Sequence, residues 1–543
     1  MYKLPVIIIG AGSVGLSLAA ELGWRGIECL IVEQNSGLNP HPRANAVANR
    51  TMEYYRRWGI DKKITTAGIP PDHPADYYWI SSLHGKQLHR ISLPAFKRIK
   101  EIKNPGDNVK KEHTWSPYLK TITGQNEVEE IILNYIKSLP SVKVNFNHKL
   151  IDFSQNADGV TSKIKNIKTG IIKEIKSQYM VACDGGKSKV REKLNINLKG
   201  RADMAKFVSI YFRAPEFMKC HKFGTANIYF PLHKKYAGFL LNWDGGTTFT
   251  YHLMLQKNQI WDEVNPKSAI ESVLGSRTKI EIISVQPWTA HALVAEKYVD
   301  KRIILSGDAA HLFSPTGGFG MNTGVSDAID IAWKLQAMIK GWGGKNLIDS
   351  YFYERHSIGV RNTQEAADCF DQIYSVMQYG DELDEETNKG KSLRKKLSVS
   401  LKEQDKLIAS SGTLLGYRYT NSPIIISDGT PETIDNPRVY IPTARPGHRA
   451  PHIWLEEGIS ILDKFGKDFT LICFKNDKIG IHKFMVTAKV MKIPLHIIKI
   501  EDKDASKLYE FNFILVRPDL MVAWRSNLLP ENPRTVLEKI SGI

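Results

Sequence analysis

The chain is poor in cysteine, and its cysteines form no motif. They are Cys29, Cys183, Cys220, Cys369 and Cys473, scattered over 543 residues with no CxxC pair. A disulfide framework or a cysteine metal cluster needs grouped thiols, so the spacing argues against both. The pattern favours a reducing cytoplasm, and no metal site is expected.

Long apolar runs are also missing. No stretch approaches the roughly 20 apolar residues needed to cross a bilayer, and Met1-Tyr2-Lys3 leads directly into an expected buried strand, so neither a membrane span nor a cleavable signal peptide is expected. The hydrophobic fraction of 42% and aromatic fraction of 10% are those of a globular protein. The length predicts more than one domain.

Acidic residues are too few to balance the basic ones, which leaves a net charge of +17. Such a charge can indicate nucleic-acid binding. Here the basic residues are dispersed and lack a nucleic-acid motif, so we interpret them as a solvated surface and expect no nucleic-acid partner. A positive surface can still attract small anionic ligands.

The N-terminal segment has the spacing of a dinucleotide-binding fold. A strand over residues 4–9 leads into GAGSVG and a helix to about residue 25, and a second strand ends in an acidic residue. The first glycine permits a tight turn, the second lets the backbone approach a pyrophosphate, and the third allows close helix packing, while the acid accepts from ribose hydroxyls. The residues assigned to the dinucleotide are Gly10, Gly12, Ser13, Val14, Gly15, Glu33 and Gln34. The pattern does not separate FAD from NAD.

A second glycine-rich stretch, ILSGDAAHLFSPTGGFGMNTGVSDAIDIAWKL, begins at Ile303. It predicts a short buried strand, a glycine loop and a helix from about Asn322. Glycine lets the backbone approach a bound group closely, and a helix N-terminus is electropositive. The stretch therefore predicts a site for a delocalised anion or an electron-rich ring edge.

GDAAH, Pro315 and GGFGMN together resemble the second flavin-binding motif of the class A flavoprotein aromatic hydroxylases. The resemblance implies that Asp308 holds a ribityl hydroxyl of FAD and that the GGFGMN backbone faces the N1/C2=O edge of the flavin ring. It implies that Arg43 reaches the pyrophosphate and ring, that Gln125 contacts the ribityl chain, and that Asp184 in the DG motif contacts FAD or pyridine nucleotide. The full set assigned to FAD in the second motif is Gly307, Asp308, Pro315, Gly318, Gly320, Met321 and Asn322.

Two further regions complete the resemblance. Short aromatic-rich strands between residues 206 and 256, joined by residues 76–113, predict an antiparallel sheet that could form the floor and lid of an aromatic-substrate site. The C-terminal PGHRAP and RPD…AWR phrases resemble the thioredoxin-like domain of the larger phenol and polyketide hydroxylases. Without a CxxC pair, dithiol redox chemistry is excluded there.

The predicted fold is α/β: a glutathione-reductase-like FAD-binding Rossmann domain interleaved with a mostly antiparallel substrate-binding sheet, plus a thioredoxin-like C-terminal domain. The predicted domains are 1–75 with 114–190 and 284–380 for FAD, 76–113 with 191–283 for substrate, a charged helical linker at 381–430, and the C-terminal domain at 431–543.

By the same resemblance, the chain is expected to be a cytoplasmic FAD-dependent monooxygenase, monomeric or homodimeric. It would use NADPH or NADH and O₂, through a flavin C4a-hydroperoxide, to hydroxylate a phenol or a polycyclic, polyketide-like aromatic. An oxidase or dehydrogenase of the same fold, or an antibiotic-inactivating flavin monooxygenase, stays open. A halogenase is disfavoured because WxWxIP is absent.

No catalytic side chain is identified, since the sequence contains no obvious nucleophile, triad or metal constellation. Candidates for a base that deprotonates a phenol are His84, His233, Tyr229 and His252. We interpret His311 of GDAAH as a structural residue rather than an acid or base.

Overall fold

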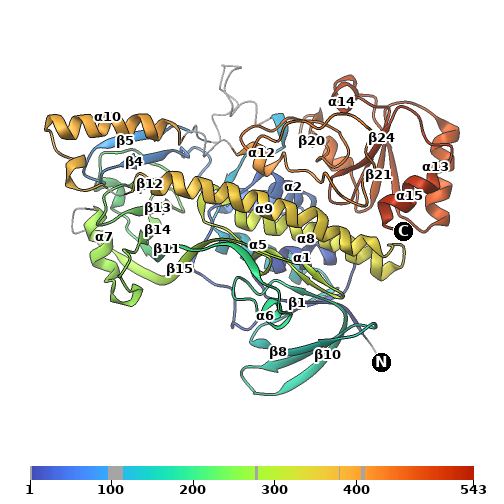
Figure 1. Ribbon diagram of the computed structural model, residues 1–543, viewed down its shortest axis with the longest axis horizontal. Helices are drawn as coiled ribbons and strands as arrows, with labels where there is room; N and C mark the ends of the chain where they lie inside the picture. Colours follow the sequence, from blue (N-terminus) through green and yellow to red (C-terminus); the bar gives the residue numbers. More distant parts are fainter. Residues whose placement is uncertain (1–2, 94, 96–113, 275–278, 378, 405–409) are drawn as a thin grey trace.

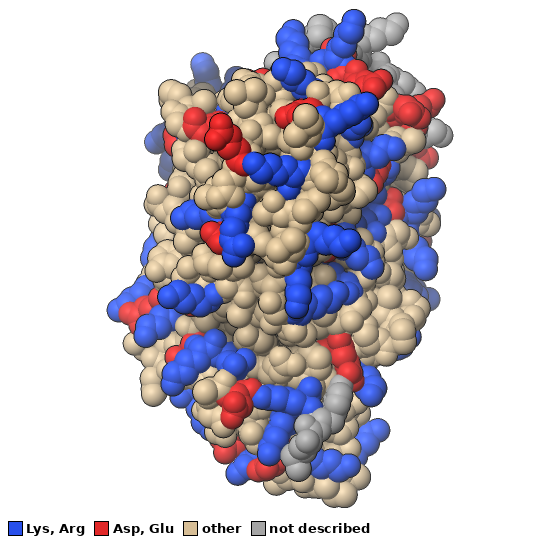
Figure 2. Space-filling model, turned by 90° about the vertical axis from the view of Figure 1, so that its right-hand side faces the viewer, with Lys and Arg blue, Asp and Glu red and all other residues tan. Residues whose placement is uncertain are grey.

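Two large sheets and a smaller C-terminal sheet organise the computed structural model (Figure 1). It describes residues 3–93, 95, 114–274, 279–377, 379–404 and 410–543. Lys and Arg side chains are scattered over the face shown in Figure 2, separated by other residues, as expected for a dispersed positive charge. In the described ranges no helix is long and apolar enough to span a bilayer.

Parallel strands form the centre of the first sheet, in the order β17, β10, β1, β2 and β7. The apolar runs of β1, β2 and β17 and the end of β10 are buried, as expected for strands covered on both faces. Antiparallel β8, β9 and β16 complete the sheet. Its strands are β1 Leu4–Ile9, β2 Cys29–Val32, β7 Val142–Asn145, β8 His148–Gln155, β9 Val160–Asn166, β10 Ile172–Ala182, β16 Val299–Asp300 and β17 Ile303–Leu305.

Helix α1 (Ser13–Trp24) packs against both α5 (Gln125–Lys137) and α8 (Phe319–Lys340) beside this sheet. The predicted strand–glycine–helix order at both flavin motifs is therefore confirmed. The carboxyl ends of β1, β2, β10 and β17 meet at one edge, where open α/β sheets bind their ligands. All of the glycine-rich segments begin at this edge.

The second sheet has the order β18, β15, β11, β14, β13, β12, β4 and β5, and it is antiparallel except where β12 pairs with β4. The predicted antiparallel sheet, with a contribution from the segment after residue 76, is thus confirmed; residues 94 and 96–113 lie outside the described ranges. Its strands are β4 Tyr77–Ile80, β5 Gln87–Ile91, β11 Leu198–Arg213, β12 Ile228–Pro231, β13 Gly238–Asn242, β14 Thr248–Met254, β15 Glu281–Ala295 and β18 His311–Leu312.

The division into domains at residue 284 stays a prediction. Strand β15 extends across that position and pairs with β11 in the second sheet. Helix α9 (Asn346–Tyr374) packs on both α8 and β15, so it contacts both large layers. Helix α10 (Asn388–Lys402), in the predicted linker, packs on β5 and buries Leu397 and Leu401 beside Trp79.

The smaller elements connect these layers or lie at their margins. They are β3 Ala46–Val47, β6 Thr121–Ile122, α2 Asn49–Arg57, α3 Asp61–Ala67, α6 Lys189–Lys193, α7 Pro266–Leu274, α12 Ser411–Leu414, β19 Trp454–Glu456 and β20 Ile459–Ser460. β3 and β6 pair with each other, which fixes the residues before α2 close to those before α5.

The C-terminal sheet has the order β22, β21, β23, β24, with β21 and β22 parallel and the other pairs antiparallel. This β-α-β-α-β-β-α arrangement confirms the thioredoxin-like prediction. Its elements are β21 Phe469–Cys473, α13 Lys478–Val490, β22 Leu495–Lys499, α14 Lys503–Tyr509, β23 Phe513–Val516, β24 Val522–Ser526 and α15 Pro533–Ser541.

Candidate functional site

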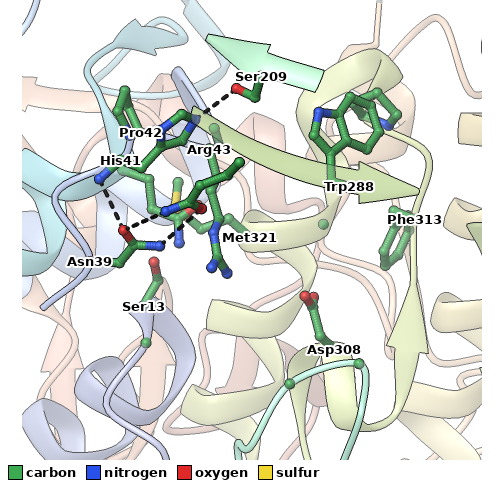
Figure 3. Close-up of a pocket in the computed structure, with 18 of the residues that line it drawn as sticks. Ser13, Asn39, His41, Pro42, Arg43, Ser209, Trp288, Asp308, Phe313 and Met321 are labelled. Carbon is green, nitrogen blue, oxygen red and sulfur yellow. Dashed lines mark hydrogen bonds between the residues drawn. The ribbon is translucent and has the colours of Figure 1, made fainter. Parts of the chain in front are cut away.

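A single cavity of about 1400 Å³ extends from the glycine-rich edge of the first sheet to the face of the second sheet. Figure 3 shows both sides of it, with Ser13 and Asp308 below and Trp288 above. Most of the residues predicted to bind the cofactor line this cavity: Gly10, Gly12, Ser13, Val14, Glu33, Gln34, Arg43, Gln125, Asp184, Asp308, Pro315, Gly318, Gly320 and Met321. Gly15, Gly307 and Asn322 do not line it.

The three glycines of GAGSVG have different surroundings. A Cβ on Gly10 would lie 2.3 Å from the carbonyl oxygen of Cys183, and its φ of +104° is unfavourable for other residues. A Cβ on Gly15 would lie 2.1 Å from the carbonyl oxygen of Gly10. In contrast, a Cβ on Gly12 would meet nothing closer than a Glu129 oxygen at 3.9 Å. Gly12 therefore keeps space clear for a ligand, whereas the other two permit close packing of the chain.

The start of α1 is held by Glu129, a residue that the sequence analysis did not single out. The carboxylate accepts from the backbone N–H of Ser13 at 2.9 Å, from the Ser13 hydroxyl at 2.8 Å and from the Gln125 amide at 2.7 Å. Burial raises the pKa of Glu129, although these donors oppose the rise. Gln125 thus lies in the cavity wall beside the first glycine loop.

Glu33 follows β2 and orders the opposite side of the loop. Its carboxylate accepts from the backbone N–H of Ala11 at 2.9 Å and of Asn35 at 2.8 Å. Glu33 and Gln34 both line the cavity, so a ribose bound there would be within their reach. Their assignment to the ribose stays a prediction.

The second motif brings a carboxylate and a left-handed turn into the cavity. The Asp308 side chain is exposed to the cavity. The surrounding protein nevertheless desolvates its carboxylate and raises its pKa, despite the nearby charges of His311 and Arg43. Gly317 and Gly318 have φ values of +80° and +70°, which a glycine adopts without strain. Because Gly318 caps the helix, α8 begins at Phe319 rather than near Asn322.

Two residues of this motif have internal roles instead. A Cβ on Gly307 would lie 2.8 Å from Val14, so Gly307 permits close contact between the two glycine loops. The Asn322 side chain accepts from the Ala48 backbone N–H at 2.8 Å and donates to the Ala46 carbonyl at 2.9 Å. It joins α8 to the segment before α2, and its assignment to FAD stays a prediction.

The remaining polar groups fit a flavin dinucleotide. The Arg43 side chain extends into the middle of the pocket in Figure 3. One buried carboxylate oxygen of Asp184, Oδ1, has no hydrogen-bond partner within the described residues. The open space beside Gly12 and the Arg43 guanidinium match a pyrophosphate. The unpaired carboxylate oxygen of Asp184 matches a hydroxyl group of a polyhydroxyl chain.

The other half of the cavity is apolar and aromatic. Phe207 and Trp288 stack face to face, with ring centroids 4.2 Å apart and an interplanar angle of 4°. This half is lined by Tyr77, Trp79, Phe207, Ile228, Phe230, Phe239, Leu241, Met254, Trp288, Phe370, Ile373, Tyr374 and Met377. The last four come from the end of α9 and the residues after it, which sequence reasoning did not assign to the site; no sequence signal marked them.

Of the candidates for a base, only His252 lines the cavity. His84 is exposed, and the Tyr229 hydroxyl donates to the Gly224 carbonyl at 2.8 Å. His233 is paired with Asp381. His311 is buried against Asp327, with 2.6 Å between Nε2 and the carboxylate, which is consistent with a structural role.

His41, which sequence reasoning missed, joins the two halves of the site. Its Nε2 lies 2.7 Å from the Ser209 hydroxyl of β11, and its Nδ1 lies 2.7 Å from the Ser284 hydroxyl of β15. Burial and the nearby Arg43 charge lower the pKa of His41 to about 4, so the ring is neutral. His41 thereby fixes the Arg43 loop against the second sheet (Figure 3). Its position two residues before Arg43 was the only available signal.

Comparison with known proteins identifies similar chains over the full length. The family model described as FAD binding domain matches residues 3–366, and the model described as aromatic-ring hydroxylase, C-terminal, matches residues 443–542. The FAD-dependent monooxygenase apdD of Emericella nidulans is 27% identical, covering 99% of this chain and 90% of that protein. The solved structure of native and K252c-bound RebC-10x is 30% identical, with a TM-score of 0.90 and full coverage of both chains. An aklavinone-11 hydroxylase in complex with FAD and aklavinone is 25% identical, with a TM-score of 0.82 and full coverage of both chains.

Proposed function

Because this chain belongs to the family of FAD-dependent aromatic-ring hydroxylases, we propose that it hydroxylates a polycyclic phenol with NAD(P)H and O₂. FAD is its cofactor, and its activity class is that of an aromatic monooxygenase. The polycyclic substrate, the use of NADPH or NADH, and the cytoplasmic location are our proposals. The five cysteines, all free thiols, support a reducing compartment.

The continuity of the cavity carries the proposal. Gly12, Asp308 and Gly318 line one half, and Phe207, Phe239 and Trp288 line the other half of the same space. An aromatic ring on the second sheet would therefore share one largely apolar volume with a flavin held at the first. The aklavinone-11 hydroxylase complex, which contains both FAD and a substrate, supports a polycyclic ligand of this kind.

When bound, FAD supplies the redox chemistry: it accepts reducing equivalents from NAD(P)H and activates O₂ for oxygen transfer. The chain contributes orientation and exclusion of water. Phe207 and Trp288 present flat apolar surfaces on which an aromatic ring can stack. His41 hydrogen-bonds to Ser209 on β11 and Ser284 on β15, the strands that carry these two rings, and so joins the Arg43 loop to them. At the other end, the start of α8 directs its positive end at the cavity, where a reduced flavin would carry negative charge.

The test uses the FAD-loaded protein with NADPH or NADH and a panel that includes phenol, 1-naphthol and 1-hydroxyanthraquinone. We expect nicotinamide oxidation to rise with a polycyclic phenol, and mass spectrometry to show one ¹⁸O atom from ¹⁸O₂ in the product. Substrate oxidation without oxygen incorporation would instead identify an oxidase or dehydrogenase. Oxygen transfer confined to an antibiotic such as tetracycline would identify an antibiotic-inactivating enzyme. Size-exclusion chromatography with light scattering would decide between a monomer and a homodimer.

A further inference from the structure

A row of polar side chains crosses the otherwise apolar floor of the substrate half. Ser209 on β11 pairs in register with His252 on β14 and with Gln286 on β15. All three line the cavity. Because residues two positions apart on a strand face the same way, Phe207 lies on the same face of β11 as Ser209, and its register partners are Met254 and Trp288. The floor therefore has a polar row beside an apolar, aromatic row.

The polar row lies on the flavin side of the floor. Ser209 is hydrogen-bonded to His41, and Gln286 is hydrogen-bonded to Asn39, so two of its three members contact the loop that carries Arg43. Figure 3 shows the contact between Ser209 and His41 beside Arg43. The third member, His252, has no such contact and is held by Trp288 instead.

The contact with Trp288 determines which nitrogen of His252 carries the proton. The indole N–H of Trp288 can only donate, and it lies 3.1 Å from Nδ1 of His252. Nδ1 must therefore be the acceptor, which leaves the proton of the neutral imidazole on Nε2. Stacking on Phe239, with centroids 4.4 Å apart, also fixes the plane of the ring.

The Nε2–H group has nothing to donate to. It is buried, and no hydrogen-bond partner for it exists among the residues that the structure describes. Burial, with a smaller effect from His41, lowers the pKa of His252 to about 3, so a second proton does not bind at neutral pH. A buried donor without an acceptor costs about 1–3 kcal/mol. Because His252 lines the cavity, a ligand bound there can supply the acceptor.

We propose that His252 is a specificity residue whose Nε2–H donates a hydrogen bond to an oxygen atom of the substrate. The inference rests on the proposed function and narrows it: the substrate is a polycyclic aromatic with a carbonyl or phenolate oxygen above the polar row. Its apolar rings then lie over Phe207 and Trp288. In this arrangement His252 does not act as a base toward the phenol, because Nδ1 is occupied and Nε2 already holds its proton.

The experiment measures ligand binding by the change in flavin absorbance, which does not depend on turnover. The probes are 1-naphthol with naphthalene, and 1-hydroxyanthraquinone with anthracene, so that each pair differs in oxygen substituents. We compare wild type with His252→Leu, which removes the donor, and with His252→Gln, whose amide can donate from a similar place. His221→Leu is the matched control, because His221 is a half-buried histidine that packs on Tyr229 of the same sheet and does not line the cavity.

For His252→Leu we expect the oxygenated probe to bind about tenfold to a hundredfold more weakly, with little change for the hydrocarbon. His252→Gln should recover part of that loss, and His221→Leu should retain the wild-type ratio. Equal weakening of both members of a pair would show a purely structural role and overturn the inference. If the wild type binds a phenol and transfers oxygen but His252→Leu keeps its preference, only the inference fails. If the wild type binds none of the probes and oxidises NAD(P)H independently of them, the proposed function fails as well.

Discussion

Gly15 in the first turn of α1 faces the carbonyl oxygen of Gly10 so closely that a Cβ would lie 2.1 Å from that oxygen. The contact explains why the loop needs its third glycine even without a ligand. Gly12, between them, has no such contact and an ordinary φ of −76°. The same hexapeptide therefore contains positions needed for folding and a position needed for binding.

Gly12→Ala should separate the requirement for folding from the requirement for ligand binding. We expect the unfolding free energy of the FAD-free protein to change by less than about 0.5 kcal/mol, because the nearest atom to the added Cβ, a Glu129 oxygen, is 3.9 Å away. FAD should bind at least tenfold more weakly, since the methyl group occupies the path of the pyrophosphate. Flavin fluorescence titration and thermal unfolding measure the two quantities.

The matched variant is Gly15→Ala, which should destabilise even the FAD-free protein by about 1–3 kcal/mol through overpacking. If Gly12→Ala bound FAD normally, the pyrophosphate would lie elsewhere.

Asp308→Ala should weaken FAD binding without unfolding the protein. The carboxylate opens into the cavity and is raised in pKa by burial, so a hydroxyl donor from the ligand would relieve an unfavourable environment. Loss of a hydrogen bond to a charged group costs about 1.5–3 kcal/mol, or roughly a tenfold to hundredfold change in dissociation constant. Equilibrium dialysis of FAD measures it.

Asp158→Ala is the control for this variant, because Asp158 is an exposed residue of the β8–β9–β10 region. Unchanged flavin content in Asp308→Ala would contradict the role assigned to the GDAAH motif.

Sequence reasoning identified the parts of the site that depend on local chain geometry. Gly10, Gly15 and Gly318 are required by close backbone contacts or left-handed turns within a few residues, and such requirements leave a spacing in the sequence. His41 and Glu129 had no comparable pattern. Their partners, Ser209 and Ser13, are distant in sequence, so only the folded chain shows what they hold.

Contacts between residues distant in sequence also explain why the lining of the aromatic half could not be predicted in full. The strands around Phe207 could be predicted to carry aromatic side chains, but the face that lines the cavity depends on the register between β11, β14 and β15. Tyr374 at the end of α9 contributes to the wall only because that helix crosses the second sheet.

His41 should make the site sensitive to mild acid. Its pKa is lowered to about 4 by burial and by Arg43, whereas an unfolded histidine titrates near 6.5. Between these values the unfolded chain binds more protons, so stability is lost as the pH falls from about 6.5 to 4. His41→Gln should reduce this dependence in thermal unfolding measured across that range.

The control is His482→Gln, with thermal unfolding measured over the same pH range, since His482 is exposed on α13. A pH profile of His41→Gln identical to that of the wild type would show that protonation of His41 does not determine acid stability.

The contact between the C-terminal domain and the rest of the protein contains buried charges that do not balance. Arg517 binds Asp519 at 2.6 Å, and both Asp330 and Glu354 at 2.9 Å. Lys334 also binds Asp330 and Glu354, at 2.7 and 2.6 Å. Two cations thus face three carboxylates in the interior.

Arg517→Met should destabilise the protein by about 3–5 kcal/mol, because it leaves buried carboxylates without sufficient positive charge. Chemical denaturation measures the change. Arg534→Met, which removes an exposed pair with Glu538, should cost less than about 1 kcal/mol. Equal effects of the two substitutions would show that the buried network does not contribute to the domain contact.

Asp330→Asn should remove a pH dependence that the same network creates. Burial and the nearby carboxylates of Glu354 and Asp519 raise the pKa of Asp330 to about 7, although Lys334 and Arg517 oppose the rise. An unfolded aspartate titrates near 3.9, so between about pH 4 and 7 the folded chain binds more protons and stability falls as the pH increases. The amide imitates the protonated acid, so the slope of unfolding free energy against pH should become smaller in the variant over this window. If the slope of unfolding free energy against pH stayed the same, a group other than Asp330 would bind the proton in this pH window.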